Sequence, residues 1–197
     1  IKYKVFPTPH LQISNLISNF YKPEINFVSD QVKIFPEILS IYNYKNFRIR
    51  KIKLYNNSLE IDIKNIRNFS KFIAQLDKKI SFKNLDFLIK DKKKDILELN
   101  KVEFLNYGYK KNIIFGKVFN EKFKIDFKED FRNTNFKLVD SGISASLSIK
   151  EKLDKDIFIG DFKGEILKSR FKTNFTYEED TFKINDFFFR DKDLSFD

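Results

Sequence analysis

The chain has no cysteine and no methionine, and its few glycines and prolines lie in different parts of the sequence. Without cysteine, these 197 residues form no disulfide and no thiolate metal site, whichever redox compartment holds them. Without methionine, Ile1 is not a natural start, and we expect the chain to be a segment of a longer protein. All four prolines lie within the first 36 residues and all five glycines follow residue 107. The N-terminal part of the chain is therefore interrupted by proline and the C-terminal part by glycine.

Long apolar runs are also missing. No stretch approaches the roughly 18 consecutive apolar residues of a membrane-spanning helix. No secretory signal peptide is visible either. A spanning helix or a signal peptide could lie upstream of this segment. We therefore expect any membrane anchor to precede Ile1.

The chain carries an excess of positive charge, with a formal net charge of +10. Such an excess raises nucleic acid or an anionic membrane as a partner. However, the 38 basic residues are interspersed with 28 acidic ones. Phe, Ile, Lys and Asn, which all have AT-rich codons, make up 100 of the 197 residues. Codon bias together with a solvated outer face is the explanation that we favour.

Short segments with one apolar and one charged face dominate the sequence from Leu59 onward. Apolar residues alternate with polar ones, as in a strand with one buried face. The clearest examples are residues 59–63, 123–127, 143–149, 171–175 and 182–184. Charged turns separate the segments at fairly even spacing, which is typical of an antiparallel meander. The sequence predicts one mainly β domain over residues 1–197, built as a curved antiparallel sheet.

The front of the chain adds shorter elements. Residues 36–42 fit a short helix with Pro36 in its first turn, and residues 66–76 have the spacing of an amphipathic helix. The alternation changes phase at Arg50-Lys51, which indicates a β-bulge. Residues 56–58 (Asn-Asn-Ser) are typical of a turn. We therefore expect two short helices near the N-terminal end of the sheet.

Residues that carry chemistry are scarce. His10 is the one histidine, so a His-centred triad or a multi-histidine metal site is not expected, and its place beside Pro9 favours a structural role. The acidic pair at residues 129–130 and the three acidic residues 178–180 lie in predicted turns, where solvated carboxylates are usual. We predict no enzyme activity, no cofactor and no metal.

The apolar face therefore carries the functional argument. It must curl on itself, meet a second sheet or hold an apolar ligand. A closed sandwich, whose exposed edge pairs with a partner strand, is one alternative. A basic sheet that binds nucleic acid is a weaker one, because the Phe residues alternate inward whereas Lys shares the outer face with Asp and Glu.

Four stretches have a recognisable pattern. Residues 6–15 (FPTPHLQISN) look like a proline-marked first strand, and residues 32–41 with 47–54 look like a strand, a short helix and the next strand. Residues 80–89 and the strands over 162–187 continue the style. In these stretches the chain resembles the AsmA family of bacterial envelope proteins. The resemblance covers most of the chain, is strongest over residues 6–90, and consists of hydropathy patterns rather than catalytic residues.

The resemblance implies a periplasmic protein held to the inner membrane by one helix upstream of this segment. It also implies an elongated β-fold with an open apolar groove, related to bridge-like lipid carriers, that contributes to phospholipid transport to the outer membrane and to its assembly. The expected partners are phospholipid acyl chains, the inner membrane and outer-membrane assembly proteins, with no nucleic acid. The residues predicted to line the groove are Ile61, Phe87, Leu99, Phe123, Ile125, Phe127, Leu147, Phe171, Phe175 and Ile184.

Overall fold

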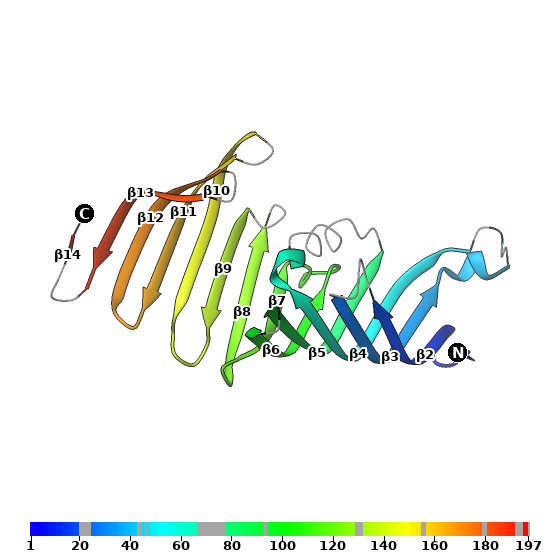
Figure 1. The fold of residues 1–197 in the computed structure, drawn as a ribbon. Coiled ribbons are helices and arrows are strands. Elements are labelled where there is room, and N and C mark those ends of the chain that lie inside the picture. Colours follow the sequence, from blue (N-terminus) through cyan, green and yellow to red (C-terminus); the bar gives the residue numbers. More distant parts are fainter. Residues whose placement is uncertain are drawn as a thin grey trace. The chain divides into compact units, whose positions relative to one another are not determined.

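The protein is mainly β and its strand pairs are mostly antiparallel, as a computed structural model shows (Figure 1). The structure describes residues 1–19, 25–42, 45, 47–66, 78–92, 94–128, 132–154, 157–178, 181–191 and 195–196. The chain divides into two compact units, Ile1–Phe119 (unit 1) and Asn120–Asp197 (unit 2). The prediction of a mainly antiparallel β-fold is confirmed, whereas the action of both units as one domain stays a prediction.

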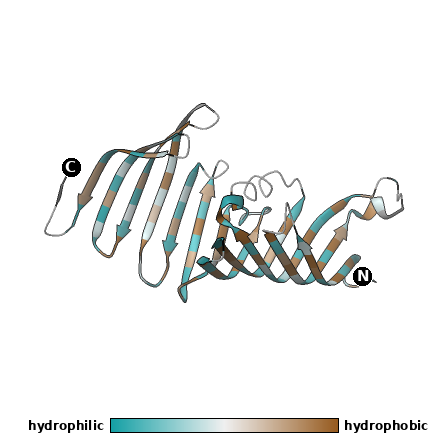
Figure 2. Ribbon diagram, viewed as in Figure 1, coloured by the Kyte–Doolittle hydropathy of each residue, from teal (hydrophilic) through white to brown (hydrophobic). Residues whose placement is uncertain are grey.

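Strands β1 to β7 of unit 1 lie side by side in sequence order. They are β1 Lys2–Lys4, β2 His10–Asn19, β3 Ile25–Pro36, β4 Ile49–Asp62, β5 Lys79–Asp91, β6 Lys94–Leu105 and β7 Ile113–Val118. Neighbours are antiparallel except β4 and β5, which run parallel. Apolar and polar residues alternate along most of each strand, so each strand carries both kinds along its length (Figure 2).

Unit 2 repeats this simple order with shorter connections. Its strands are β8 Glu121–Lys128, β9 Asn133–Leu138, β10 Ser144–Asp154, β11 Ile157–Ile166, β12 Ser169–Glu178, β13 Thr181–Arg190 and β14 Ser195–Phe196. Each described pair of neighbours in unit 2 is antiparallel. The β11–β12 hairpin closes between Ile166 and Ser169 with Leu167 at a φ of 58°. A residue at positive φ suits a two-residue hairpin turn.

The first of the two predicted short helices is not an α-helix, and nearly all of the second lies outside the described residues. The first is a 3₁₀ helix, η1 Ile38–Tyr42, which begins two residues after Pro36, the last residue of β3. The Ser40 hydroxyl donates to the Glu37 carbonyl at 2.7 Å, so a side chain satisfies backbone groups within this single turn. The second prediction, residues 66–76, lies outside the described residues except for Ile66, which follows η3 Ile63–Asn65. None of the described helices has the length and apolar character needed to cross a bilayer.

The predicted bulge at Arg50-Lys51 is confirmed. Phe35 pairs with Lys51 and Pro36 pairs with Ile49, so Arg50 is one extra residue on β4. The turn predicted at residues 56–58 is wrong, because β4 runs through it without interruption. Asn56 instead has a φ of 49°, a conformation that Asn tolerates within a strand as well as in a turn.

A line of such bends crosses unit 1. Asn15 in β2, Asn56 in β4, Asn84 in β5 and Lys101 in β6 all have φ between 49° and 55°. The register places them at corresponding points of their strands, and the Asn84 side-chain amide donates to the Asn56 side-chain oxygen at 2.9 Å. Buried positions change phase at each bend: Leu54 precedes the bend in β4 and Leu59 follows it, both on one face. We call Asn15, Asn56, Asn84 and Lys101 the bend line.

Substitutions at Asn84 test the bend line. Asn84→Val places a β-branched residue at positive φ, which costs about 1–2 kcal/mol, and removes the bond to Asn56, so we expect a loss of about 2 kcal/mol. Asn84→Gly keeps the backbone conformation accessible and loses only an exposed side-chain bond. Urea denaturation compares the two variants. Equal losses of stability would show that the backbone conformation at this position is not the reason for Asn.

Candidate functional site

The apolar face of unit 2 is built from rows of side chains that lie directly opposite one another. Opposed residues on neighbouring antiparallel strands point to the same side of a sheet. One row joins Ile125, Phe136, Ala145, Gly164, Phe171 and Phe189 from β8 to β13. The next row joins Phe127, Thr134, Leu147, Phe162, Thr173 and Phe187. The rows define a continuous apolar strip across six strands.

The structure brings all seven predicted groove residues of unit 2 onto this apolar face. Four of them lie in the two rows, two lie directly beside the rows on β8 and β12, and Ile184 lies opposite Phe175. The seven are Phe123, Ile125, Phe127, Leu147, Phe171, Phe175 and Ile184. Their shared face follows from register, whereas contact with lipid stays a prediction.

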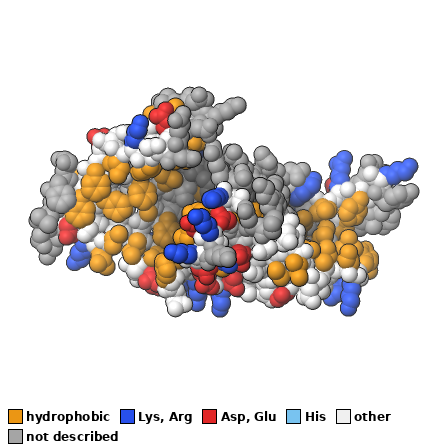
Figure 3. All heavy atoms as spheres, in the orientation of Figure 1, with side chains coloured by type: hydrophobic (Ala, Val, Ile, Leu, Met, Phe, Trp, Pro, Cys, Tyr) orange, Lys and Arg blue, Asp and Glu red, His pale blue; other side chains and the backbone are white. Residues whose placement is uncertain are grey.

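Burial varies strongly along this face. Phe123 is 2% exposed and stacks on Phe136 with ring centroids 6.3 Å apart, so it belongs to a packed core. At β13, Ile184 is 59% exposed, and Phe182 and Phe187 on the same face are also exposed. Figure 3 shows hydrophobic side chains gathered over β11–β13. The apolar face of unit 2 is therefore open to solvent at its β13 side.

Two aromatic rings of β12 lie over glycines of β11. Phe175 is opposite Gly160 and Phe171 is opposite Gly164. A Cβ atom placed on Gly160 would stand 2.8 Å from the Phe175 ring, and one on Gly164 would overlap the Phe171 ring. The Phe175 ring also stacks on Phe182 at 4.9 Å. Because glycine has no side chain, each ring can lie directly over the β11 backbone instead of standing above a neighbouring side chain.

The three predicted residues of unit 1 also share one face. Register links Leu59, Phe87, Leu99 and Val118 across β4 to β7, and Ile61 lies one position along from Leu59 on the same face. Ile61 is 0% exposed, beside the nearly buried Ile25 of β3. Phe87 and Leu99 are half-buried. A lipid would reach Ile61 only if its neighbours moved, so this position belongs to the core of unit 1.

The reasoning from sequence missed the exposed aromatics of β13. Phe182 and Phe187 lie on the apolar face, whereas Phe188 lies opposite Lys172 on the other side of the sheet. A bulge places Asn185 as an extra residue between the two halves of β13. The signal was present in the change of phase within FKINDFFF, where one extra polar residue separates two alternating pairs.

The opposite, charged face of unit 2 carries a hollow of about 640 Å³. Lysines and acids alternate along it, and its lining includes Lys137, Lys163 and Lys172. Two of its acids are paired: Asp126 with Lys124 at 2.8 Å, and Glu165 with Arg170 at 3.5 Å. Apolar groups of Phe136, Phe171 and Phe188 also line this hollow, so it combines charged rims with an apolar floor.

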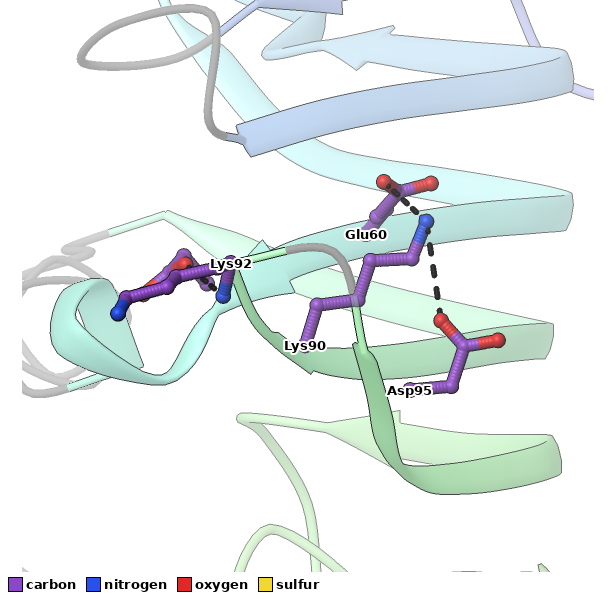
Figure 4. Close-up of polar contacts among 5 residues, drawn as sticks. Glu60, Lys90, Lys92 and Asp95 are labelled. Atoms are coloured by element: carbon purple, nitrogen blue, oxygen red, sulfur yellow. Dashed lines mark hydrogen bonds and ion pairs between the residues drawn. The ribbon is translucent and has the colours of Figure 1, made fainter.

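The charged face of unit 1 has an acidic part beyond the bend line, formed by the ends of β4, β5 and β6. The Lys90 ammonium lies 2.6 Å from Glu60 and 3.9 Å from Asp95, so one lysine links three strands (Figure 4). The hydrogen bond to Glu60 raises the pKa of Lys90 above its usual value. The Asp62 carboxylate accepts from the backbone N–H groups of Lys64 and Lys92, and these bonds lower its pKa. These acids therefore stabilise the ends of strands and the turns beside them.

His10 is placed as a structural residue. Its ring is 5% exposed, stacks on Phe35 at 5.2 Å, and its Nδ1 donates to the Thr8 carbonyl at 2.7 Å. Within the described ranges, no group of three or more His, Asp or Glu side chains is arranged to hold a metal ion. The absence of enzyme activity stays a prediction.

Fold and site together define a class: a β-protein whose strands follow one another in sequence order, with one apolar and one charged face in each unit. No protein-family model, curated protein or solved structure matches the chain.

Proposed function

We propose that the chain is an AsmA-like envelope protein that holds phospholipid acyl chains against its apolar β-face. In this role it contributes to phospholipid transport to the outer membrane, and to the assembly of that membrane, from the periplasmic side of the inner membrane. The mechanism is passive: hydrocarbon slides along the apolar strip, with no covalent step and no cofactor. The observation that supports the proposal is the continuous apolar strip of unit 2, open at β13.

The dimensions of the apolar face are sufficient for this role. Five strand spacings of about 4.8 Å, from β8 to β13, give a strip of roughly 24 Å within unit 2 alone. One leaflet of a bilayer has an apolar depth of about 15 Å, half of the hydrocarbon core. Each methylene that leaves water gains about 0.8 kcal/mol, so the strip offsets much of the cost of extracting an acyl chain.

Photo-crosslinking at two adjacent residues tests the proposal. Phe187 (47% exposed) lies on the apolar face and Phe188 (39% exposed) lies on the charged face of the same strand. A benzophenone-bearing phenylalanine at either position changes little else. We expect phospholipid adducts, detected by mass spectrometry of protein from a bacterial envelope, at Phe187 and not at Phe188.

Other adduct patterns would contradict lipid binding. Equal labelling of both positions would indicate contact with a membrane surface in general. Protein adducts at Phe187 without lipid would indicate that a partner sheet covers the apolar face, as in a structural module of the envelope. Absence of any adduct at Phe187 would also reject the groove.

A further inference from the structure

The charged face of unit 1 is divided by the bend line into two parts of opposite character. The first part lies alongside the β4 residues that precede Asn56. There, the residues of β3 to β6 that point to the charged face include five lysines and one acid, Glu103, all within the described strands. The lysines are Lys33, Lys51, Lys53, Lys79 and Lys83. Beyond the bend line the outward positions carry Glu60, Asp62 and Asp86. We call the five lysines, with the aromatic residues Phe35, Tyr55 and Tyr107, the basic half.

Like charges face one another directly in the basic half. Lys33 is opposite Lys53 on the antiparallel β3–β4 pair, and Lys51 is opposite Lys79 on the parallel β4–β5 pair. Directly opposed like charges destabilise a sheet by a few tenths of a kcal/mol or more. Lysine can be paired with an acid on these strands: beyond the bend line, Lys90 of β5 forms an ion pair with Glu60 of β4. Unmatched lysines at these registers indicate that a negative charge from outside the chain compensates them.

Aromatic rings hold the lysine ammonium groups in place. Lys33 lies 5.1 Å from the Tyr55 ring centroid, Lys53 lies 5.5 Å from Phe35, and Lys51 lies 4.8 Å from Tyr107. These are cation–π distances. Burial raises the pKa of Tyr107, but hydrogen bonds with Lys51 and Ser81, together with the charges of Lys51 and Lys53, bring it below the ordinary value.

We propose that the basic half binds the anionic phosphate headgroups of a membrane surface. The lysine ammonium is a point charge that donates hydrogen bonds to phosphate oxygens in many directions, and tyrosine suits the headgroup level of a bilayer. Single-stranded nucleic acid, the other polyanion, needs free ring faces on which bases stack. Here Lys33, Lys51 and Lys53 each occupy a ring face, so headgroups fit the arrangement better. The inference concerns unit 1 and its charged face, so it does not rest on lipid binding by the apolar face of unit 2.

Sedimentation with lipid vesicles tests this proposal on the whole chain. We expect binding to vesicles that contain about 30% anionic lipid, a steep loss of binding as salt rises, and no binding to neutral vesicles. The variant Lys33→Gln/Lys51→Gln/Lys53→Gln should bind about a hundredfold more weakly, because each lysine near an anionic surface contributes about fivefold. Its thermal midpoint should change little, because the relief of two like-charge contacts offsets the loss of three cation–π contacts.

A control variant of the same net charge separates a site from general attraction. Lys92, Lys94 and Lys101 are exposed lysines of unit 1 outside the basic half, and their replacement by Gln should reduce binding only a few-fold. Equal losses in both triple variants, or undiminished binding to neutral vesicles, would overturn the proposal. Tighter binding to single-stranded oligonucleotide than to anionic vesicles, lost in the first variant, would replace headgroups by nucleic acid as the ligand.

Discussion

Phe175→Asp is expected to unfold the middle of unit 2, with a loss of about 5 kcal/mol of stability. Phe175 is 6% exposed, lies over Gly160 and stacks on Phe182. Removing such a ring costs about 3–5 kcal/mol, and an unpaired buried carboxylate adds to that cost. The loss is a large part of the 5–15 kcal/mol that stabilises a typical domain. Hydrogen exchange should show loss of protection in peptides from β11–β13 while peptides from β3–β5 keep theirs.

Ile184→Asp is the matched control, because Ile184 lies directly opposite Phe175 on the same face. Its side chain is largely in solvent, so the same new charge should cost less than about 1 kcal/mol. If the apolar face binds acyl chains, this substitution should also abolish lipid adducts at Phe187. Retained protection of β11–β13 in Phe175→Asp would mean that Phe175 lines an open groove, and that its burial does not support the sheet.

Much of this fold follows from period-two alternation. Residues 123–127 and 171–175 were predicted as strands with their apolar residues on one side, and β8 and β12 contain them in that arrangement. The predicted groove residues share a face for the same reason: alternation fixes the side on which a residue points. Alternation fixes only the side of the sheet on which each residue lies. The cross-strand rows depend in addition on the register in which each hairpin pairs.

Burial depth and the bend line were not predictable in this way. Ile61 and Ile184 have the same place in the alternation, but one is completely buried and the other is exposed, since burial depends on the position of a strand within its unit. The Asn-Asn-Ser segment at residues 56–58 has the composition of a turn, and Asn56 does adopt a turn-like φ. Pairing of β4 with β3 and β5 on both sides keeps the strand continuous through it, which is a tertiary effect.

The glycine pair of β11 had a signal that sequence reasoning did not use. Gly160 and Gly164 are four residues apart, as are Phe171 and Phe175 in the next strand. A two-residue turn at Leu167-Lys168 puts each glycine opposite a phenylalanine. Glycine in a strand often marks a close approach by another group, here the flat ring of the neighbouring strand. The repeated spacing therefore predicts the ring-over-glycine contacts once the hairpin is known.

Gly164→Val tests these contacts and should destabilise unit 2 by about 1–2 kcal/mol. A side chain at this position favours a strand over the flexible unfolded chain, a gain of at most about 1 kcal/mol. It also collides with the Phe171 ring, and crowding of this kind costs about 1–3 kcal/mol, or more if the ring leaves the sheet. The clash prevails because the Cβ atom alone already overlaps the ring. Urea denaturation followed by the β signal of circular dichroism gives the loss.

The double variant Gly164→Val/Phe171→Ala isolates the contact between the two residues. Without the ring, valine should no longer be crowded and should recover its strand preference, so the double variant is expected to be more stable than the sum of single losses predicts by about 2 kcal/mol. Additive losses would mean that the ring and the glycine do not depend on each other. Coupling of the predicted sign would show that glycine is needed on β11 because the aromatic floor of the apolar face lies directly on its backbone.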